Sequence, residues 1–210
     1  MSNSMSKISK SLSDVIDQYA LKEGEHKIVL NSIIESKKSK GDLWVFGYGS
    51  LMWRPGFPYK EKHFGIVHGY HRSFCVFSHF HRGSRELPGL VLGLDLGGSC
   101  KGMLYRVSAV DAEKVVEYLI KREMVTTAYA PSWVKVRAGG LVTLAHTYIV
   151  MQKHTQYAGK LTLEKAAKYI RGNHGQSGSN ADYLRKTINH LEKMRLNTDF
   201  LKSLQNLVEN

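Results

Sequence analysis

Short runs of apolar residues dominate the middle of the chain and predict a sheet. They lie at residues 43–46, 64–70, 72–80, 90–96, 101–107, 132–138 and 141–151, and their lengths are typical of strands. Two glycine pairs, Gly97-Gly98 and Gly139-Gly140, lie between successive runs. Each pair predicts a hairpin turn, because glycine readily supplies the positive φ that two-residue turns need. We therefore expect a mostly antiparallel sheet that is curled or closed.

Stretches with helical periodicity lie before, between and after these apolar runs in the sequence. It predicts one helix at 109–123 and three more at 162–171, 181–195 and 198–208. Two further apolar stripes precede the first strand, one formed by Leu12, Val15, Ile16 and Tyr19 and one by Val29, Leu30, Ile33 and Ile34. The pattern predicts an α+β protein in which residues 1–41 form a helical extension with its linker and residues 42–210 form one domain.

The first strand breaks into two glycines, Gly47 and Gly49. Glycine allows positive φ and has no Cβ to keep a ligand away from the backbone, so residues 47–51 are a candidate ligand loop. A dinucleotide fingerprint needs a third glycine where Met52 stands, and Ser50 is not in the GxSxG frame of a nucleophile elbow. The alternative interpretation is a strand-end turn with an exposed serine.

Glu123 ends the apolar stripe of the helix at 109–123, after Val116, Leu119 and Ile120. Ser108 and Asp111 have the spacing of a cap at the start of this helix. Partial burial and the negative end of the helix dipole both disfavour the charged carboxylate, so we expect a raised pKa and a candidate proton shuttle. The alternative is a frayed last turn in which Glu123 pairs with a neighbouring cation in solvent.

The formal net charge of +12 makes nucleic acid a partner to consider. Lys and Arg are scattered along the chain, the densest cluster being 37–40, and no RRM, KH or zinc-finger pattern is present. We therefore expect a solvated basic surface and no nucleic-acid partner. His79 and His81 share a predicted strand face but have no third ligand of matching spacing, so no metal is expected.

Two cysteines, Cys75 and Cys100, are too few for a disulfide framework, and Cys75 sits in an apolar run as a small core residue. The N-terminus lacks the apolar core of a signal peptide, and no run approaches the length of a membrane span. These features predict a cytoplasmic protein without a membrane partner. They do not determine its oligomeric state.

Three ordered motifs together carry a family resemblance. They are Val45-Phe-Gly-Tyr-Gly-Ser-Leu51, Tyr118-Leu-Ile-Lys-Arg-Glu123 and Gly178-Ser-Asn-Ala-Asp-Tyr-Leu184, and the stretches 81–83, 88–95 and 98–102 accompany them. In that order they resemble the ChaC family of glutathione-specific γ-glutamylcyclotransferases over about residues 42–195. A small departure is Ser132, where a basic residue is common in relatives.

The resemblance implies a small β-barrel flanked by helices that cuts glutathione into 5-oxoproline and cysteinylglycine without a metal or cofactor. It assigns Glu123 as the acid/base, residues 48–51 as the loop that holds the γ-glutamyl group, and Tyr183 as a further contact. The loop residues are Tyr48, Gly49, Ser50 and Leu51. Two alternatives remain open, a basic RNA- or protein-binding module without turnover and a cyclotransferase for another γ-glutamyl peptide or amine.

Overall fold

The computed structural model describes residues 21–37 and 41–210. The apolar stripe predicted at residues 12–19 lies outside the described residues. The described chain forms two compact units, one containing residues 73–93 and 152–210 and the other containing residues 21–72 and 94–151. We call them the helical unit and the barrel unit. None of the helices in the described ranges has the length and apolar character needed to cross a membrane.

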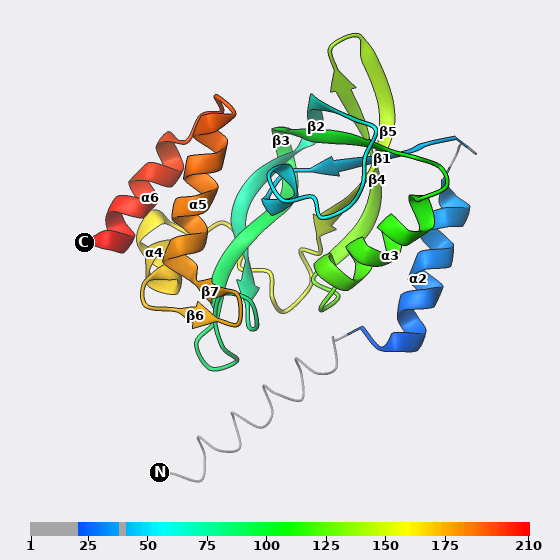
Figure 1. Ribbon diagram of the computed structural model, residues 1–210. Helices are drawn as coiled ribbons and strands as arrows, with labels where there is room; N and C mark the ends of the chain where they lie inside the picture. The colour runs from blue at the N-terminus through cyan, green and yellow to red at the C-terminus, as the bar shows by residue number, and fades with distance from the viewer. Residues whose placement is uncertain (1–20, 38–40) are drawn as a thin grey trace. The chain divides into compact units, whose positions relative to one another are not determined.

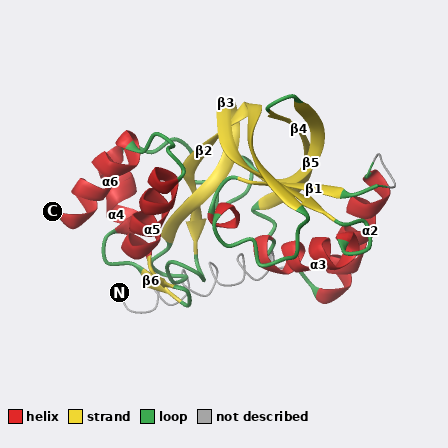
Figure 2. Ribbon diagram, turned by 45° about the horizontal axis from the view of Figure 1, so that its top comes forward, coloured by secondary structure: helices red, strands yellow, loops and turns green. Residues whose placement is uncertain are grey.

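Five strands close into a barrel in the order β1-β3-β2-β4-β5. They are β1 (Leu43–Gly47), β2 (Glu61–Ser78), β3 (Gly89–Val107), β4 (Tyr129–Ala138) and β5 (Leu141–Val150). β1 pairs antiparallel with β3, and β4 pairs antiparallel with β2 and β5. A parallel contact between Val45 and His146 closes the seam between β1 and β5. The predicted small, mostly antiparallel barrel flanked by helices is confirmed (Figures 1 and 2).

Alternation along the strands fills the barrel with apolar side chains. Phe46, Leu104, Val136 and Ala145 come from four different segments and are fully buried in one cluster. Burying such side chains is the main favourable contribution to folding. The same alternation turns Val45 and His146 away from this cluster and places them in the second buried layer of the unit.

Two glycine predictions have opposite outcomes. Gly139 has a φ of 59° and joins β4 to β5 in a two-residue turn, with Ala138 paired to Leu141, so this hairpin is confirmed. The hairpin at Gly97 and Gly98 is wrong, because β3 continues through both residues. Their φ angles of 98° and 69° bend a single long strand, which is the other use of positive-φ glycine in sheets. The runs predicted at 64–70 and 72–80 likewise belong to one strand, β2.

Two helices belong to the barrel unit, α2 (Glu23–Ser36) and α3 (Ala112–Glu123), which lie beside each other (Figure 1). α3 begins three residues later than predicted. Its N-cap, Asp111, makes no side-chain capping bond, and the Asp111 amide donates instead to the Ser108 carbonyl, so the predicted cap is wrong. The apolar face predicted for α3 is buried, and Ile33 of α2 is 4% exposed.

The helical unit contains α4 (Leu163–Ile170), α5 (Asn180–Lys193) and α6 (Asp199–Glu209), with a small hairpin of β6 (His174–Gly175) and β7 (Gly178–Ser179) before α5. The three helices pack around Phe74, Leu90 and Leu92 of the long strands. Asn180 is fully buried and bonds both the amide and the carbonyl of Leu90. Cys75 is buried in this unit, as predicted.

Candidate active site

The candidate ligand loop follows β1 directly. Tyr48 is 7% exposed, and residues Ser50–Met52 form one turn of 3₁₀ helix, η1. Neither Gly47 nor Gly49 adopts the positive φ that glycine allows. Gly47 is needed for a different reason: a Cβ at this position would lie 2.8 Å from the Cβ of Leu51. The absence of a side chain at Gly47 therefore lets the end of β1 pack closely against η1, the turn that follows it.

The loop is anchored from the barrel by two side chains. Arg72 donates through Nε to the Tyr48 carbonyl and through Nη2 to the Lys101 carbonyl at 2.6 Å. Tyr105 is 1% exposed, and its hydroxyl donates to the carbonyls of Leu51 and Met52, each at 2.9 Å. The backbone of the turn is thus held by its carbonyl groups.

The backbone amides of the same turn divide into two groups. Those of Met52 and Arg54 donate back to Gly49 and Ser50, both at 2.9 Å. Within the described part of the chain, the amides of Ser50 and Leu51 donate to no protein acceptor. They are therefore available to an external oxygen atom.

Glu123 is the last residue of α3, and its side chain is 21% exposed. Burial raises the pKa of this carboxyl above its ordinary value, although the neighbouring Arg122 opposes the change. The Arg122 Nε lies 3.0 Å from Glu123 Oε1, and the Arg122 side chain is 20% exposed. The predicted rise in the pKa of Glu123 is confirmed. Glu123 also pairs with a neighbouring cation, Arg122, as the alternative interpretation expected. The pair is half-buried, however, and α3 extends through Glu123 without a frayed last turn.

Arg122 connects this carboxylate to the ligand loop. Its Nη2 donates to Ser50 Oγ at 2.9 Å. Its Nη1 donates to the Arg54 carbonyl at 2.7 Å, the Tyr118 hydroxyl at 2.8 Å and the Pro55 carbonyl at 3.1 Å. One planar guanidinium therefore holds the acid, the serine and the segment after the turn in fixed positions.

Two buried polar side chains lie on the same face of β5, with their ring centres 5.0 Å apart. His146 is 0% exposed and Tyr148 is 2% exposed, and neither the His146 ring nitrogens nor the Tyr148 hydroxyl has a hydrogen-bond partner in the described residues. Burial lowers the pKa of His146 to about 4, so the ring is neutral. Burial, and secondarily the charge of Glu123, raises the pKa of Tyr148.

Tyr183 belongs to the helical unit, in the first turns of α5. Its ring packs edge-on against Phe74 at 5.8 Å, and the Arg82 guanidinium carbon lies 5.0 Å from the ring centre. Arg82 also donates to the Ser177 and Ser179 carbonyls. Within the barrel unit, the structure brings together the predicted loop residues and Glu123.

Three residues of this site were not found by sequence reasoning. Arg72 and Tyr105 lie within strands and match no local chemical motif, and Arg122 enters the sequence analysis only as part of the motif that ends at Glu123. The arginine directly before the candidate acid was the one available signal. Its contact with Ser50 joins positions 72 residues apart, which no local pattern records.

Comparison with known proteins identifies the family of the chain. The family model described as ChaC-like protein matches residues 43–210. The chain is 33% identical to the glutathione-specific γ-glutamylcyclotransferase of Escherichia coli, over 83% of this chain and 76% of that protein. It is 37% identical to glutathione-specific γ-glutamylcyclotransferase 1 of Homo sapiens, over 68% and 66% of the two chains.

A solved structure supports the same grouping. The γ-glutamylcyclotransferase specific to glutathione from yeast superposes with a TM-score of 0.73 at 26% identity, covering 80% of this chain and 96% of that one. The family model covers the barrel, the loop after β1, the end of α3 and the helices that follow. From Leu43 to its last residue, this chain belongs to the ChaC-like protein family.

Proposed function

We propose that this protein is a glutathione-specific γ-glutamylcyclotransferase in which Glu123 is the acid/base. The observation that carries the proposal is the hydrogen-bonded connection from Glu123 through Arg122 to Ser50. It joins a carboxyl group of raised pKa to a loop with available backbone amides. A binding module without turnover has no need of a half-buried acid beside such a loop.

The reaction needs no enzyme nucleophile, because the substrate carries its own. The α-amine of the γ-glutamyl group attacks the γ-carbonyl carbon, the C–N bond to cysteine breaks, and the products are 5-oxoproline and cysteinylglycine. A tethered amine gains a large effective concentration once the chain is held bent. The task of residues 48–51 is therefore to bind the γ-glutamyl group in that conformation.

Glu123 moves the protons of this reaction. The ionised carboxylate accepts a proton from the attacking amine, and the carboxylic acid then returns one to the departing cysteinyl nitrogen. A carboxyl of raised pKa is a better base when ionised and remains available as an acid closer to neutral pH. Burial, the cause of its raised pKa, therefore suits the residue to both steps.

The γ-carbonyl oxygen acquires negative charge as the amine attacks. The amides of Ser50 and Leu51 are the available donors of the turn, and we assign them to this oxygen. Fixed donors stabilise developing charge without reorganising at the moment of reaction. Tyr105 and Arg72 bond the carbonyl groups of the same loop, which keeps the amides oriented.

Ser50 and Arg122 are positioning groups in this mechanism. Ser50 Oγ accepts a hydrogen bond from Arg122, and no base in the described residues bonds to that hydroxyl to activate it. Tyr183 as a substrate contact rests on the family resemblance. Tyr183→Phe tests it: a raised KM with an unchanged fold supports the contact, and unchanged kinetics contradict it.

The direct test is to incubate the purified protein with reduced glutathione and measure 5-oxoproline and cysteinylglycine. Equal amounts of the two products are expected. Turnover of γ-glutamyl peptides other than glutathione at a comparable kcat/KM would contradict the specificity. An absence of turnover with any γ-glutamyl compound would favour the binding-module alternative.

Reaction in oxygen-18-labelled water separates cyclisation from hydrolysis. Cyclisation leaves the ring carbonyl of 5-oxoproline unlabelled, because that oxygen was the amide oxygen of the substrate throughout. Excess hydroxylamine is the companion test, since it intercepts an acyl-enzyme but cannot compete with a tethered amine. Labelled glutamate as the first product, or a hydroxamate, would overturn the mechanism.

A further inference from the structure

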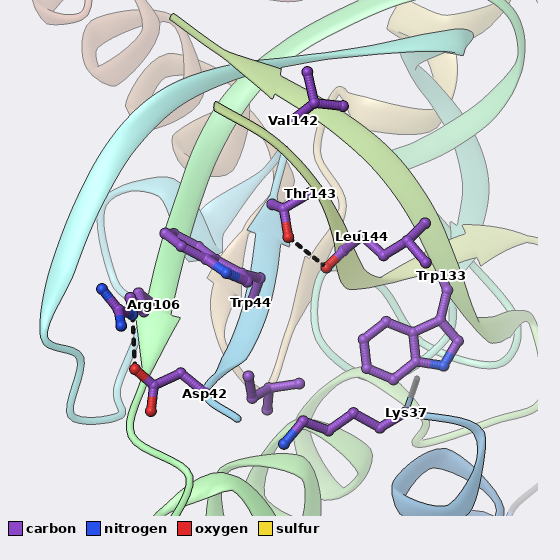
Figure 3. A pocket seen from close by; sticks show the side chains of 9 residues that line it. Lys37, Asp42, Trp44, Arg106, Trp133, Val142, Thr143 and Leu144 are labelled. Atoms are coloured by element: carbon purple, nitrogen blue, oxygen red, sulfur yellow. Dashed lines mark hydrogen bonds and ion pairs between the residues drawn. The ribbon is translucent and has the colours of Figure 1, made fainter. Parts of the chain in front are cut away.

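Three aromatic rings form a row on the face of β4 and β5 that points away from the barrel interior. The ring centres of Trp133 and His146 lie 5.5 Å apart, and those of His146 and Tyr148 lie 5.0 Å apart. Trp133, at one end of the row, lines a pocket beside β1 (Figure 3). His146 and Tyr148 are not among the described residues that line this pocket. The row therefore runs from that pocket into the buried part of the barrel unit.

Strand register places the Tyr148 end of the row on the same side of the sheet as the ligand loop. β1 and β5 run parallel and pair at Val45 and His146. Gly47 and Tyr148 each follow this pair by two residues, so they lie on the face that the pair shares. A Cβ on Gly47 would point at η1, where it would lie 2.8 Å from the Leu51 Cβ. Tyr148 therefore lies on the side of the sheet on which η1 lies.

Glu123 approaches η1 from the end of α3. Arg122 bonds Ser50 Oγ of η1 at 2.9 Å, and its Nε lies 3.0 Å from Glu123 Oε1. Burial first, and then the charge of Glu123, raises the pKa of Tyr148. Burial alone lowers the pKa of His146. Of the two buried polar groups on β5, Tyr148 is therefore the one within electrostatic reach of Glu123.

The Tyr148 hydroxyl is a donor without an acceptor. The side chain is 2% exposed, and its hydroxyl has no hydrogen-bond partner in the described part of the chain. Its raised pKa keeps the proton on the oxygen, so the group can donate. An unbonded buried hydroxyl costs stability, and such a group in a native protein calls for an explanation such as a bound water or a role in catalysis.

Glu123 has the complementary need for a donor. Among the residues that the structure describes, Arg122 is the one group that bonds this carboxyl. An ionised carboxylate removed from water is stabilised by each further hydrogen bond that it accepts. The unbonded phenol and the sparsely bonded acid therefore suit each other.

We propose that Tyr148 is a positioning residue whose hydroxyl donates to the Glu123 carboxylate once that group is ionised. This inference rests on the proposed role of Glu123 as the acid/base. The bond would hold the carboxylate in the direction from which it accepts the proton of the substrate amine. Hydrogen bonds to a charged acceptor are stronger than those to a neutral one. The bond therefore weakens when Glu123 is protonated, and the acid is free to return its proton to the departing cysteinyl nitrogen.

Tyr148→Phe removes the hydroxyl and keeps the ring. The acid limb of its kcat/KM profile with glutathione should move to higher pH by about one pH unit, with kcat/KM on that limb about tenfold lower, because a hydrogen bond to a charged group is typically worth this much. Carbon-13 NMR of the glutamate carboxyls, assigned with Glu123→Gln, should show the same rise in the pKa of Glu123 without substrate.

The other ionisable groups around this carboxyl are unchanged in the variant. Arg122 of α3 is the charged group that acts on Glu123. Tyr118 of α3 accepts a bond from Arg122, and Tyr105 of β3 is influenced by the Arg122 charge. His146 of β5 remains in place beside the ring. A difference between the variant and the parent protein therefore arises from the missing hydroxyl.

His146→Phe is the matched control, because it removes another buried, unbonded polar group from the same strand face. It should leave the pKa of Glu123 and the acid limb unchanged. The urea midpoint of Tyr148→Phe at pH 4 should be no lower than that of the parent protein, because Glu123 is then protonated and the hydroxyl has no strong bond to lose.

Three results would overturn the proposal. They are an unchanged pKa of Glu123 in Tyr148→Phe, which would assign the hydroxyl to a bound water, an equal rise in both variants, and a lowered urea midpoint of Tyr148→Phe at pH 4, which would show a structural role. A parent protein without turnover would contradict the proposed function instead. The NMR titration needs no turnover and would still decide whether Tyr148 bonds Glu123.

Discussion

At the residue scale, Glu123 is in a position where folding and catalysis make opposite demands. Its pKa is raised in the folded state, so the folded protein prefers the protonated form. The ionised form needed to accept a proton therefore destabilises the fold at pH values above the folded-state pKa. This cost is absent below pH 4.5, the ordinary pKa of a glutamate side chain, because Glu123 is then protonated in both the folded and the unfolded protein.

Glu123→Gln separates the effect of the carboxyl group on turnover from its effect on the stability of the fold. Turnover should fall by at least ~100-fold, because the titrating group is lost. The midpoint of urea unfolding at pH 8 should rise, and this gain should vanish below pH 4.5. Glu113→Gln, at an exposed position on the same helix, is the control and should keep full turnover. Near-normal activity in Glu123→Gln would remove this residue from the mechanism.

Arg122 is the second prediction at this scale. Arg122→Gln removes the positive charge that opposes the raised pKa of Glu123, so the acid limb of the kcat/KM profile should move to higher pH. Arg122→Lys keeps a positive charge but lacks the planar set of N–H donors of a guanidinium. Its kcat should therefore fall, while the acid limb of its kcat/KM profile should move less than in Arg122→Gln.

Ser50→Ala tests the partner of Arg122. Its loss of transition-state stabilisation should be ~1 to 3 kcal/mol, without a burst phase. Because Arg122 and Ser50 bond each other, the double variant should lose less than the two single losses added together. Strict additivity, or a γ-glutamyl ester on Ser50 in the parent protein, would contradict this assignment.

At the element scale, the junction of β1 with η1 depends on Gly47. Gly47→Ala would place a Cβ 2.8 Å from the Leu51 Cβ, and relief of such overlap typically costs ~1 to 3 kcal/mol. Moving η1 also moves the Ser50 and Leu51 amides, so kcat should fall at temperatures where the protein remains folded. Gly140→Ala is the control, because no atom lies within 4 Å of its added Cβ. Equal effects of the two changes would show that the junction tolerates a side chain.

β5 supplies a prediction about acid stability. The pKa of His146 falls from 6.5 to about 4 on folding, so the unfolded state binds more protons between these pH values. Stability contributed by neutral His146 should therefore be lost as pH falls from 6.5 to 4, by about 3 kcal/mol. His146→Phe should keep the ring contacts with Trp133 and Tyr148 and remove this part of the pH dependence. The measurement is urea unfolding across that pH range, and parallel curves for the two proteins would contradict it.

At the scale of the whole molecule, truncation tests whether the predicted N-terminal extension contributes to catalysis. Every proposed catalytic and substrate-binding residue lies after Gly41, so a chain starting there should keep turnover per folded molecule. That chain also loses α2, with buried Ile33 and the Ser36 acceptor of Trp133, so its melting temperature should be lower. A chain starting at Leu21 retains α2 and should avoid this loss. Inactivity of a folded chain starting at Gly41 would mean that α2 contributes to the site.

The amino-acid pattern alone determined the features that depend on neighbouring residues. Apolar runs located β1, β4 and β5, the Gly139-Gly140 pair located a hairpin, and the stripe ending at Glu123 indicated a half-buried acid. Each of these signals lies within one strand, one turn or one helix face. The motif resemblance then indicated the family, and the roles proposed for residues 48–51 rest on it.

Only the tertiary structure decided which distant groups meet. The strand order β1-β3-β2-β4-β5 brings Arg72 to the Tyr48 carbonyl across 24 positions and Arg122 to Ser50 across 72. Gly97 and Gly98 have the same local signal as a hairpin pair, but both lie within one strand, β3, which is continuous from Gly89 to Val107. The physical reason is that hydrophobic periodicity specifies a face and a local conformation, whereas hydrogen-bond partners are fixed by packing the whole chain.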